Sequence, residues 1–427
     1  MNKKERILLF LLACINFAHI MDFMVMAPLG TYLMEYFTIT PAEFAGMLAI
    51  YPICAAVSSF SAAFSVDRFD RKKVLMTAYS GFILGTICCA LAPTFWVLVL
   101  ARGFAGLFGG LIGAQVMAIV ADTFPFERRG QAMGAIMGAF SLASALGVPF
   151  GLYLATHFNW HAPFVAVATM GVLLIPFTLK FLPSQRSHLD KAAADKTPPV
   201  ARLKIIGDIL RNPTQRIALA LSGFLMAAHF LIIPFLNPYL EFNKGFSKKE
   251  VLLVYIVGGV LTFFTSPIMG KLSDRWGKFR VFATAALLSV IPIVLITDLP
   301  AWPLGIVLTI TGFWFIVSSG RGIPAQAMIS EVVPPERRGG FMSFNAALQQ
   351  LFTGSASFIA GLIVVQDPVS HVILSGYNTT GYISLGILAI AFFWAYRLNR
   401  AMPKATKEKP IITATEALTL TEKEPVA

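Results

Sequence analysis

Long runs of apolar residues alternate with short polar segments along the whole chain. Each run is about 20 residues long, which is the length that an α-helix needs to cross a hydrocarbon core of about 30 Å. Helices are expected because lipid offers the backbone no hydrogen-bonding partner. The runs predict twelve membrane-spanning helices, at residues 7–34, 43–66, 74–92, 95–121, 131–156, 162–182, 215–240, 249–272, 280–298, 303–330, 341–366 and 375–397.

The composition agrees with a membrane protein. Hydrophobic residues make up 56% of the 427 positions and charged residues 13%, whereas a soluble domain carries about 25% charged residues. Four cysteines lie in apolar spans without metal-ligand spacing, so we predict neither a metal site nor a disulfide. The predicted class is an all-α membrane protein.

Two short motifs occur twice, in the same order. The charged run Asp67–Lys73 returns as Ser273–Arg280, and Pro125–Gly130 returns as Pro334–Gly339. The copies are separated by 207 and 209 residues. Nearly equal spacing indicates a duplicated unit, so the twelve helices are predicted to form two pseudo-symmetric bundles of six.

Polar segments divide the chain into four parts. We predict an N-terminal bundle at residues 1–182, a cytoplasmic linker at 183–213, a C-terminal bundle at 214–400 and a disordered cytoplasmic tail at 401–427. In this topology, 29 of the 34 lysines and arginines lie on the inner side and three on the outer side. The positive-inside rule therefore places both termini in the cytoplasm, and we expect the bacterial inner membrane. Topology thus explains the net charge of +12, and we expect no nucleic acid partner.

The repeated loop is similar to a known signature. The segment Ala63–Lys72 resembles the sequence Gly-x-Leu-Ala-Asp-Arg-x-Gly-Arg-Lys of the major facilitator superfamily, with both glycines replaced. The copy at Gly270–Lys278 keeps the glycines. The resemblance covers essentially the whole chain, and it implies the major facilitator fold in a monomeric transporter that works by alternating access.

The family implies a gate on the inner side. Asp67 would close it by facing the start of the predicted eleventh helix, where free amide groups favour an anion, and Asp274 is its counterpart in the second half. Two ion pairs are expected on the same side, Arg71 with Asp122 and Lys278 with Glu331. The alternative is a basic loop that serves only orientation.

The first predicted helix carries Asn16, His19 and Asp22, which are spaced three apart and so share one face. The segment Asp22–Pro28 resembles the helix 1 signature of the drug:proton antiporter branch, in which an Asp precedes a Pro. Intramembrane charges are costly and mark functional sites, and burial disfavours a charged carboxylate. We expect Asp22 to carry protons, with His19 close to it. The alternative is a structural carboxylate held by a nearby cation.

Arg102 is the candidate cation. It lies in Leu100–Gly106, which resembles the family motif Arg-x-x-Gln-Gly with Ala105 in place of the Gln. Because arginine itself does not titrate, Arg102 is expected to meet Asp22 across the cavity and to modulate its protonation.

The fifth predicted helix contains Gly147-Val148-Pro149-Phe150-Gly151, which resembles a motif of efflux antiporters. Gly147 and Gly151 would let a neighbouring helix approach closely, and Pro149 would allow bending. Ordinary small-residue packing is the alternative. In this topology the motif favours export.

Candidates for the substrate cavity are scattered over several helices. Arg321 is expected to contact an anionic substrate or to pair with Glu331, whereas a lone membrane histidine such as His229 is more often a packing residue. The cavity candidates are Asn16, Arg321, His229, Asn237, Phe140, Tyr255, Trp314, Asn345 and Gln349.

The sequence contains no phosphate-binding loop, His-Glu-x-x-His motif or other catalytic set, so we predict no enzyme activity and no cofactor. The predicted function is a proton-coupled secondary active transporter that exports a small organic molecule, such as a drug, a metabolite or a sugar-like solute. The alternatives are a proton-linked importer or uniporter of a sugar or organic acid, and a transporter-like sensor or lipid-handling protein. The expected partners are the solute, protons and the lipid bilayer.

Overall fold

The computed structural model describes residues 3–65, 69–124, 126–184, 207–333, 338–367 and 373–402. Within these ranges, eleven helices are long and apolar enough to cross a membrane. The remaining predicted span, residues 131–156, is divided into α6 (Phe126–Leu142), the π-helix η2 (Ala143–Gly147) and α7 (Val148–His157). The prediction of twelve spans in an all-α protein is confirmed.

The remaining elements of the two halves follow in chain order. The first half also contains α1 (Lys3–Val25), α2 (Gly30–Phe37), α3 (Pro41–Ser65), α4 (Arg71–Ala90), α5 (Phe95–Thr123) and α8 (Ala162–Phe181). The second half contains α11 (Pro213–Phe230), α12 (Ile233–Pro238), the π-helix η3 (Tyr239–Asn243), α13 (Lys248–Trp276), α14 (Lys278–Leu288), α15 (Val290–Thr297), α16 (Leu304–Glu331), α17 (Arg338–Ile363), β1 (Val365–Gln366), β2 (Leu374–Ser375) and α18 (Tyr377–Ala401).

Besides the fifth span, three spans that the sequence predicts as continuous are broken: the ninth at Ser289, between α14 and α15, and the first and the seventh near prolines. The first span is interrupted between α1 and α2, where Pro28 lacks the N–H that a continuing helix needs. The seventh span is interrupted after Phe230, and Pro234 lies in the first turn of α12, where a missing N–H is tolerated. The breaks in the first and seventh spans lie toward the same end of the molecule, so each half has an irregular segment there.

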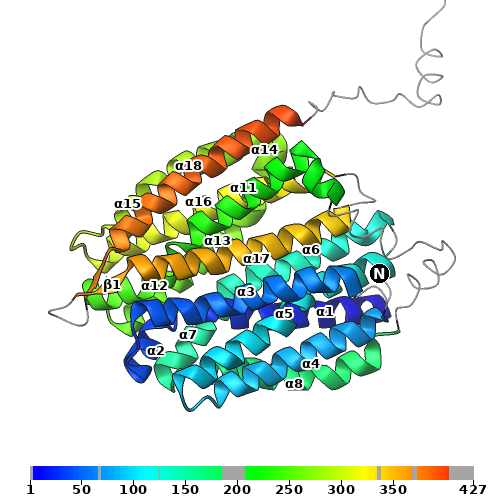
Figure 1. Cartoon of the computed structure of the whole chain (residues 1–427), viewed down its shortest axis with the longest axis horizontal. Coiled ribbons are helices and arrows are strands. Elements are labelled where there is room, and N and C mark those ends of the chain that lie inside the picture. Colours follow the sequence, from blue (N-terminus) through cyan, green and yellow to red (C-terminus); the bar gives the residue numbers. More distant parts are fainter. Residues whose placement is uncertain are drawn as a thin grey trace, which may run out of the picture.

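The two ends of the bundle differ. One end carries the antiparallel β1–β2 ribbon, in which Val365 pairs with Ser375, and we call it the hairpin end. The opposite end carries the starts of α4 and α14 with Arg71 and Lys278, and we call it the basic end. Figure 1 shows the β1–β2 ribbon at the left and the N-terminus at the right, at the basic end.

Within the described residues, the two most extensive contacts between the halves are α3 with α17 and α13 with the fifth span. Figure 1 shows α3 and α17 side by side where the first-half and second-half helices adjoin. A Cβ atom added at Gly361 of α17 would overlap Ala45 of α3, so the two backbones approach closely at the hairpin end. On the second pair, a Cβ at Gly259 of α13 would lie 2.8 Å from the backbone of Ala145 in η2. Small residues thus set both contacts, as is common between membrane helices.

Buried apolar side chains of the described residues form two clusters with different members. One cluster of buried apolar side chains extends from the second half into the hairpin end of the first half, where Leu29 and Phe44 join Phe235 and Leu236. A second cluster, around Tyr79 and Phe82, contains only first-half residues. The halves therefore share a core at the hairpin end. Most of the predicted linker and tail, residues 185–206 and 403–427, lie outside the described residues, and the domain boundaries remain predictions.

Candidate functional site

A buried ion pair joins α1 and α5. The guanidinium Nη1 of Arg102 donates to Oδ2 of Asp22 at 2.6 Å. The side chains are 1% and 0% exposed, so both charges are removed from water. Burying an isolated charge is very costly, whereas a hydrogen-bonded pair is tolerated. The structure thus brings together the two residues that the sequence motifs singled out.

Two further side chains complete this pair. The Arg102 guanidinium lies 4.4 Å from the centre of the Tyr51 ring, a cation–π contact. The Thr86 hydroxyl of α4 lies 3.4 Å from Asp22 Oδ1 and 3.1 Å from the Phe82 carbonyl oxygen, and these two acceptors share its single proton. Sequence reasoning missed both Tyr51 and Thr86.

The glycines of α5 are the signal that could have located Tyr51. A Cβ at Gly106 would overlap the Tyr51 carbonyl oxygen, and one at Gly109 would overlap the Tyr51 hydroxyl. Because these glycines have no side chain, α3 approaches α5 closely enough to place the Tyr51 ring on Arg102. The spacing of the glycines is visible in the sequence, but the partner helix is not.

His19 and Asn16 lie on α1 before Asp22. The His19 ring contacts Phe82 edge-on at 5.7 Å between centroids. Its buried Nδ1 has no hydrogen-bond partner among the described residues. Asn16 donates from Nδ2 to the Ile136 carbonyl of α6 at 3.4 Å. Asn16 therefore holds α6 against α1, while the described residues leave His19 Nδ1 without a hydrogen-bond partner.

The fifth-span motif packs directly on α1. A Cβ at Gly147 would lie 3.1 Å from Met21 Cγ, and one at Gly151 would overlap Val25. Met21 and Val25 flank Asp22 along the chain. Pro149 is buried at the start of α7, where η2 ends. Since η2 also touches α13, the fifth span lies between the helix that carries Asp22 and the opposite half of the molecule.

A second buried arginine lies in the C-terminal half. Arg321 of α16 is 2% exposed. Its Nη2 lies 3.4 Å from His229 Nδ1 and donates to Ser318 Oγ at 3.4 Å. No carboxylate in the described parts of the chain lies within 4 Å of it. The expected alternative, a pair between Arg321 and Glu331, is wrong, because ten residues of helix separate them by about 15 Å.

The other cavity candidates do not form one cluster. Trp314 is fully buried and stacks on His229 at 5.1 Å. Gln349 donates to Ser222 Oγ at 2.8 Å, and Asn345 is buried on the same helix, α17. Tyr255 of α13 is buried against Phe315. The side chain of Phe140 lies outside the described residues.

Asn237 contributes to a seal at the hairpin end. Its Nδ2 donates to the Pro28 carbonyl and to Thr31 Oγ1 at the break in the first span. Lys248 Nζ forms an ion pair with Glu35 at 2.6 Å between the halves. The exposed Lys248 and Glu35 give no sequence signal, because they are 213 residues apart. Polar contacts and the shared apolar core together close this end.

The predicted charge pairs are present at the basic end. Arg71 Nε lies 2.5 Å from Asp122 Oδ2, joining α4 to α5. Lys278 pairs with Glu331, joining α14 to α16. Each pair lies within one half, so neither holds the halves together. Asp274 is exposed, and Asp67 lies outside the described residues.

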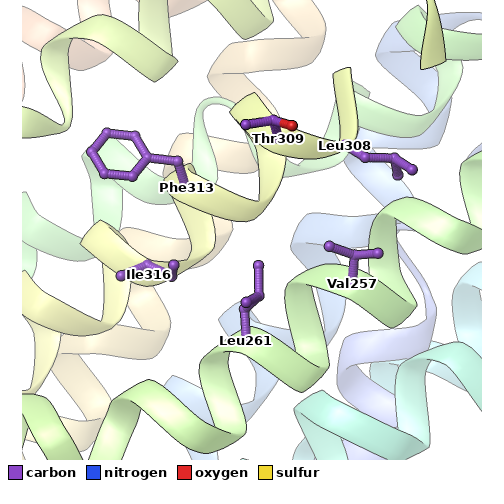
Figure 2. Close-up of a pocket in the computed structure, with 6 residues that line it drawn as sticks. All are labelled: Val257, Leu261, Leu308, Thr309, Phe313 and Ile316. Carbon is purple, nitrogen blue, oxygen red and sulfur yellow. The ribbon is translucent and has the colours of Figure 1, made fainter. Parts of the chain in front are cut away.

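An apolar groove of about 390 Å³ lies between α13 and α16. Figure 2 shows its lining, which comprises Val257, Leu261, Leu308, Thr309, Phe313 and Ile316. Only the Thr309 hydroxyl is polar, and none of the candidate site residues lines the groove. A polar solute would find no orienting group there.

Known proteins of similar sequence and fold match nearly the whole chain. The chain is 23% identical over 394 residues to the "uncharacterized MFS-type transporter YceJ" of Bacillus subtilis, covering 91% of this chain and 94% of that protein. It is 24% identical over 346 residues to the "transcription regulatory protein OpdE" of Pseudomonas aeruginosa, covering 81% and 82%. The solved structure of a D-xylose-proton symporter matches with a TM-score of 0.72, 18% identity and coverage of 93% and 97%.

The family model of the Major Facilitator Superfamily matches residues 11–322. Both bundles contribute to this match, since it extends into α16. The fold, with six spans in each half, is the one that the repeated loops predicted. These matches indicate a transporter rather than an enzyme. The chain belongs to the Major Facilitator Superfamily and is a multi-pass membrane protein of the secondary transporter type.

Proposed function

We propose that this protein is a proton-coupled antiporter that exports a small organic molecule, with Asp22 as the proton-carrying group. The observation that carries the proposal is the ion pair of Asp22 and Arg102, which is buried between α1 and α5. A carboxylate can gain or lose a proton, whereas its arginine partner stays charged. Protonation of Asp22 therefore removes the counter-charge of Arg102 and changes how strongly α1 is held to α5.

Movement of α1 is linked to the opening of the transporter. Separating a buried ion pair costs several kcal/mol, so the pair favours the state in which α1 lies against α5. The chain of α1 leads within six residues to Pro28, whose carbonyl accepts from Asn237 of the other half. A shift of α1 on proton binding would loosen this contact. Proton binding and opening at the hairpin end are coupled in this way.

The resemblance of Gly147-Val148-Pro149-Phe150-Gly151 to a motif of efflux antiporters favours export as the direction. Its glycines hold α7 and η2 against Met21 and Val25, on either side of Asp22. The same segment contacts Gly259 of α13. A change at Asp22 would thereby be transmitted to the C-terminal half, as coupling of a solute to a proton requires in either direction.

We also propose the orientation and the cellular setting. Placing the basic end in the cytoplasm puts 29 lysines and arginines on the inner side, with both termini, in a bacterial inner membrane. The hairpin end then faces the periplasm, and the structure corresponds to a state closed on that side. The segment around Asp67 would act with Arg71 and Asp122 at the cytoplasmic gate. The transporter would act as a monomer.

Import in symport with a proton is the second candidate. The Asp22–Arg102 pair couples protons in either direction, and the chain shares its fold with a D-xylose-proton symporter. Antiport and symport differ in the direction in which the proton moves relative to the solute. In antiport the proton and the solute cross in opposite directions, and in symport they cross together.

Proteoliposomes that contain a pH-sensitive dye test the coupling. Ethidium, tetraphenylphosphonium, benzoate and D-xylose would be added in turn, and the sign of the internal pH change recorded. Wild type should move protons opposite to at least one solute, and Asp22→Asn should abolish this movement. Asp298→Asn, an exposed Asp outside the site, is the matched control. Solute-driven proton movement that persists in Asp22→Asn would show that the coupling assignment is wrong.

A further inference from the structure

Arg321 is a buried cation whose charge no acidic group of the described residues balances. It is 2% exposed, and its two contacts within the described residues, His229 and Ser318, are neutral partners at 3.4 Å. Arginine stays protonated in proteins. A buried guanidinium without a counter-charge is costly, so its presence calls for an anion during the transport cycle.

Two buried donors in this region have no acceptor in the described part of the chain. They are Nη1 of Arg321 and Nε1 of Trp314. Trp314 lies seven residues before Arg321 on α16, so both side chains leave the same face of the helix about two turns apart. Neither group can accept a hydrogen bond. The ligand that satisfies them must therefore supply acceptors.

His229 of α11 connects the two donors. Its ring stacks on Trp314 with 17° between the planes, and its Nδ1 faces the Arg321 guanidinium. Because a guanidinium only donates, Nδ1 acts as the acceptor, and the proton of a neutral imidazole is assigned to Nε2. His229 thereby adds a further donor and an aromatic face to the site.

The charge selects the class of anion. Arg102 is already neutralised by Asp22, so Arg321 offers one uncompensated positive charge. A carboxylate matches the planar guanidinium with two parallel hydrogen bonds and one negative charge. A phosphate monoester would bring about two negative charges at neutral pH. One cation and neutral neighbours therefore favour a monocarboxylate.

We propose that the transported solute is a small organic monocarboxylate, held by Arg321 with Trp314 and His229. That the carboxylate is transported rests on the transport function proposed above. Binding of the carboxylate to Arg321 can be measured without a gradient. Entry to the site requires α16 to move. Pro324, three residues beyond Arg321, removes one backbone hydrogen bond of α16 and supplies a point of bending.

The test uses the purified full-length protein in detergent and matched pairs of probes. Thermal unfolding would be recorded with acetate, lactate and benzoate as sodium salts, with their neutral amides, and with sodium chloride. At least one carboxylate should raise the melting temperature of wild type, while its amide and chloride should not. The affinity from titration should fall at least about tenfold in Arg321→Gln, because the charge-assisted bonds are lost.

Two more variants keep the test decisive if Arg321→Gln folds poorly. Arg321→Lys retains the charge but loses the planar fork, so affinity should be intermediate. Trp314→Phe removes only the indole donor and should weaken binding several-fold. Arg211→Gln, at an exposed arginine, should bind as wild type does.

Several outcomes would overturn the inference. They are no stabilisation by any carboxylate, equal stabilisation by an amide, or binding that survives in Arg321→Gln. Failure here leaves the proton coupling standing, because coupling is judged by Asp22→Asn in proteoliposomes. Conversely, proton movement that persists in Asp22→Asn would remove the coupling and leave carboxylate binding standing.

Discussion

The two halves each bury one arginine, and the two arginines have opposite surroundings. Arg102 is paired with Asp22 of its own half, whereas Arg321 contacts only neutral groups in the described chain. The repeat places Thr311, not an arginine, 209 residues after Arg102. The Thr311 hydroxyl donates to the Val307 carbonyl and so satisfies itself within α16. The two halves thus share their helices and the charge pairs at the basic end, but not a buried arginine at the position of Arg102.

We propose that this difference separates two tasks. In the first half the charges of Asp22 and Arg102 balance each other, and this pair would respond to protons. In the second half no described acidic group balances Arg321, which would respond to a ligand. A spacing of 207 residues, the same as between Asp67 and Asp274, relates Asp22 to His229. The acid of one half therefore corresponds to a neutral imidazole in the other.

The largest effect is expected from breaking the balanced pair. Asp22→Asn leaves Arg102 buried without a counter-charge, so the free energy of unfolding should fall by about 3–5 kcal/mol. Denaturant titration of the protein in mixed micelles measures the change. Adding Arg102→Gln to Asp22→Asn should recover part of the loss, since the two residues interact directly. Purely additive losses would contradict a coupled pair, and Asp298→Asn is the control.

A smaller effect is expected from the aromatic ring on Arg102. Tyr51→Leu removes a desolvated cation–π contact and should lower the free energy of unfolding by about 2 kcal/mol. Tyr51→Phe keeps the ring and loses a hydroxyl that has no partner in the described structure, so it should cost far less. The same titration measures both variants. Equal losses would mean that the hydroxyl, not the ring, supports the pair.

Replacing Arg321 should change the free energy of unfolding in the opposite direction. Arg321→Met replaces a buried, uncompensated charge by an apolar chain, which is neutral or stabilising by about 1 kcal/mol in the absence of ligand. Arg102→Met, by contrast, should strongly destabilise the protein because it strands Asp22. The two variants form a matched comparison in one titration. A loss at Arg321 as large as the loss at Arg102 would remove the distinction between the halves.

The smallest effect is expected from an exposed ion pair. Lys248→Gln breaks the contact with Glu35 between the halves, where both side chains are at least one-third exposed. Exposed pairs contribute less than about 1 kcal/mol, so stability should hardly change. Spin labels on α2 and α13 should nevertheless show a larger share of molecules open at the hairpin end. An unchanged distance distribution would mean that the apolar core alone closes this end.

Much of this arrangement is predictable from the sequence. Long apolar runs and two repeated loops suffice for twelve helices in two halves, because lipid leaves the backbone few choices. The meeting of Asp22 and Arg102 follows from motif resemblance and from the high cost of unpaired charge. The pairs Arg71–Asp122 and Lys278–Glu331 follow from the repeat.

The remaining features depend on tertiary packing. The stack of Trp314 on His229 joins helices 85 residues apart in the chain, and no periodicity encodes it. The glycines of α5 indicate that another helix packs closely on α5, but they do not indicate that this helix is α3. The π-helix η2 has no local signature, since Ala143–Gly147 would also suit an ordinary α-helix.

That π-helix bears on which changes of length the fifth span can accept. Its i→i+5 hydrogen bonds place one residue more in a turn than an α-helix has, so deleting one residue from Ala143–Gly147 would close a regular α-helix with α6 and α7 close to their present phase. Deleting a residue between Val148 and Phe150 would instead turn Gly151 by about 100° away from Val25. A shortened fifth span is therefore expected to keep its contact with α1 only when the residue is removed from the π-helix.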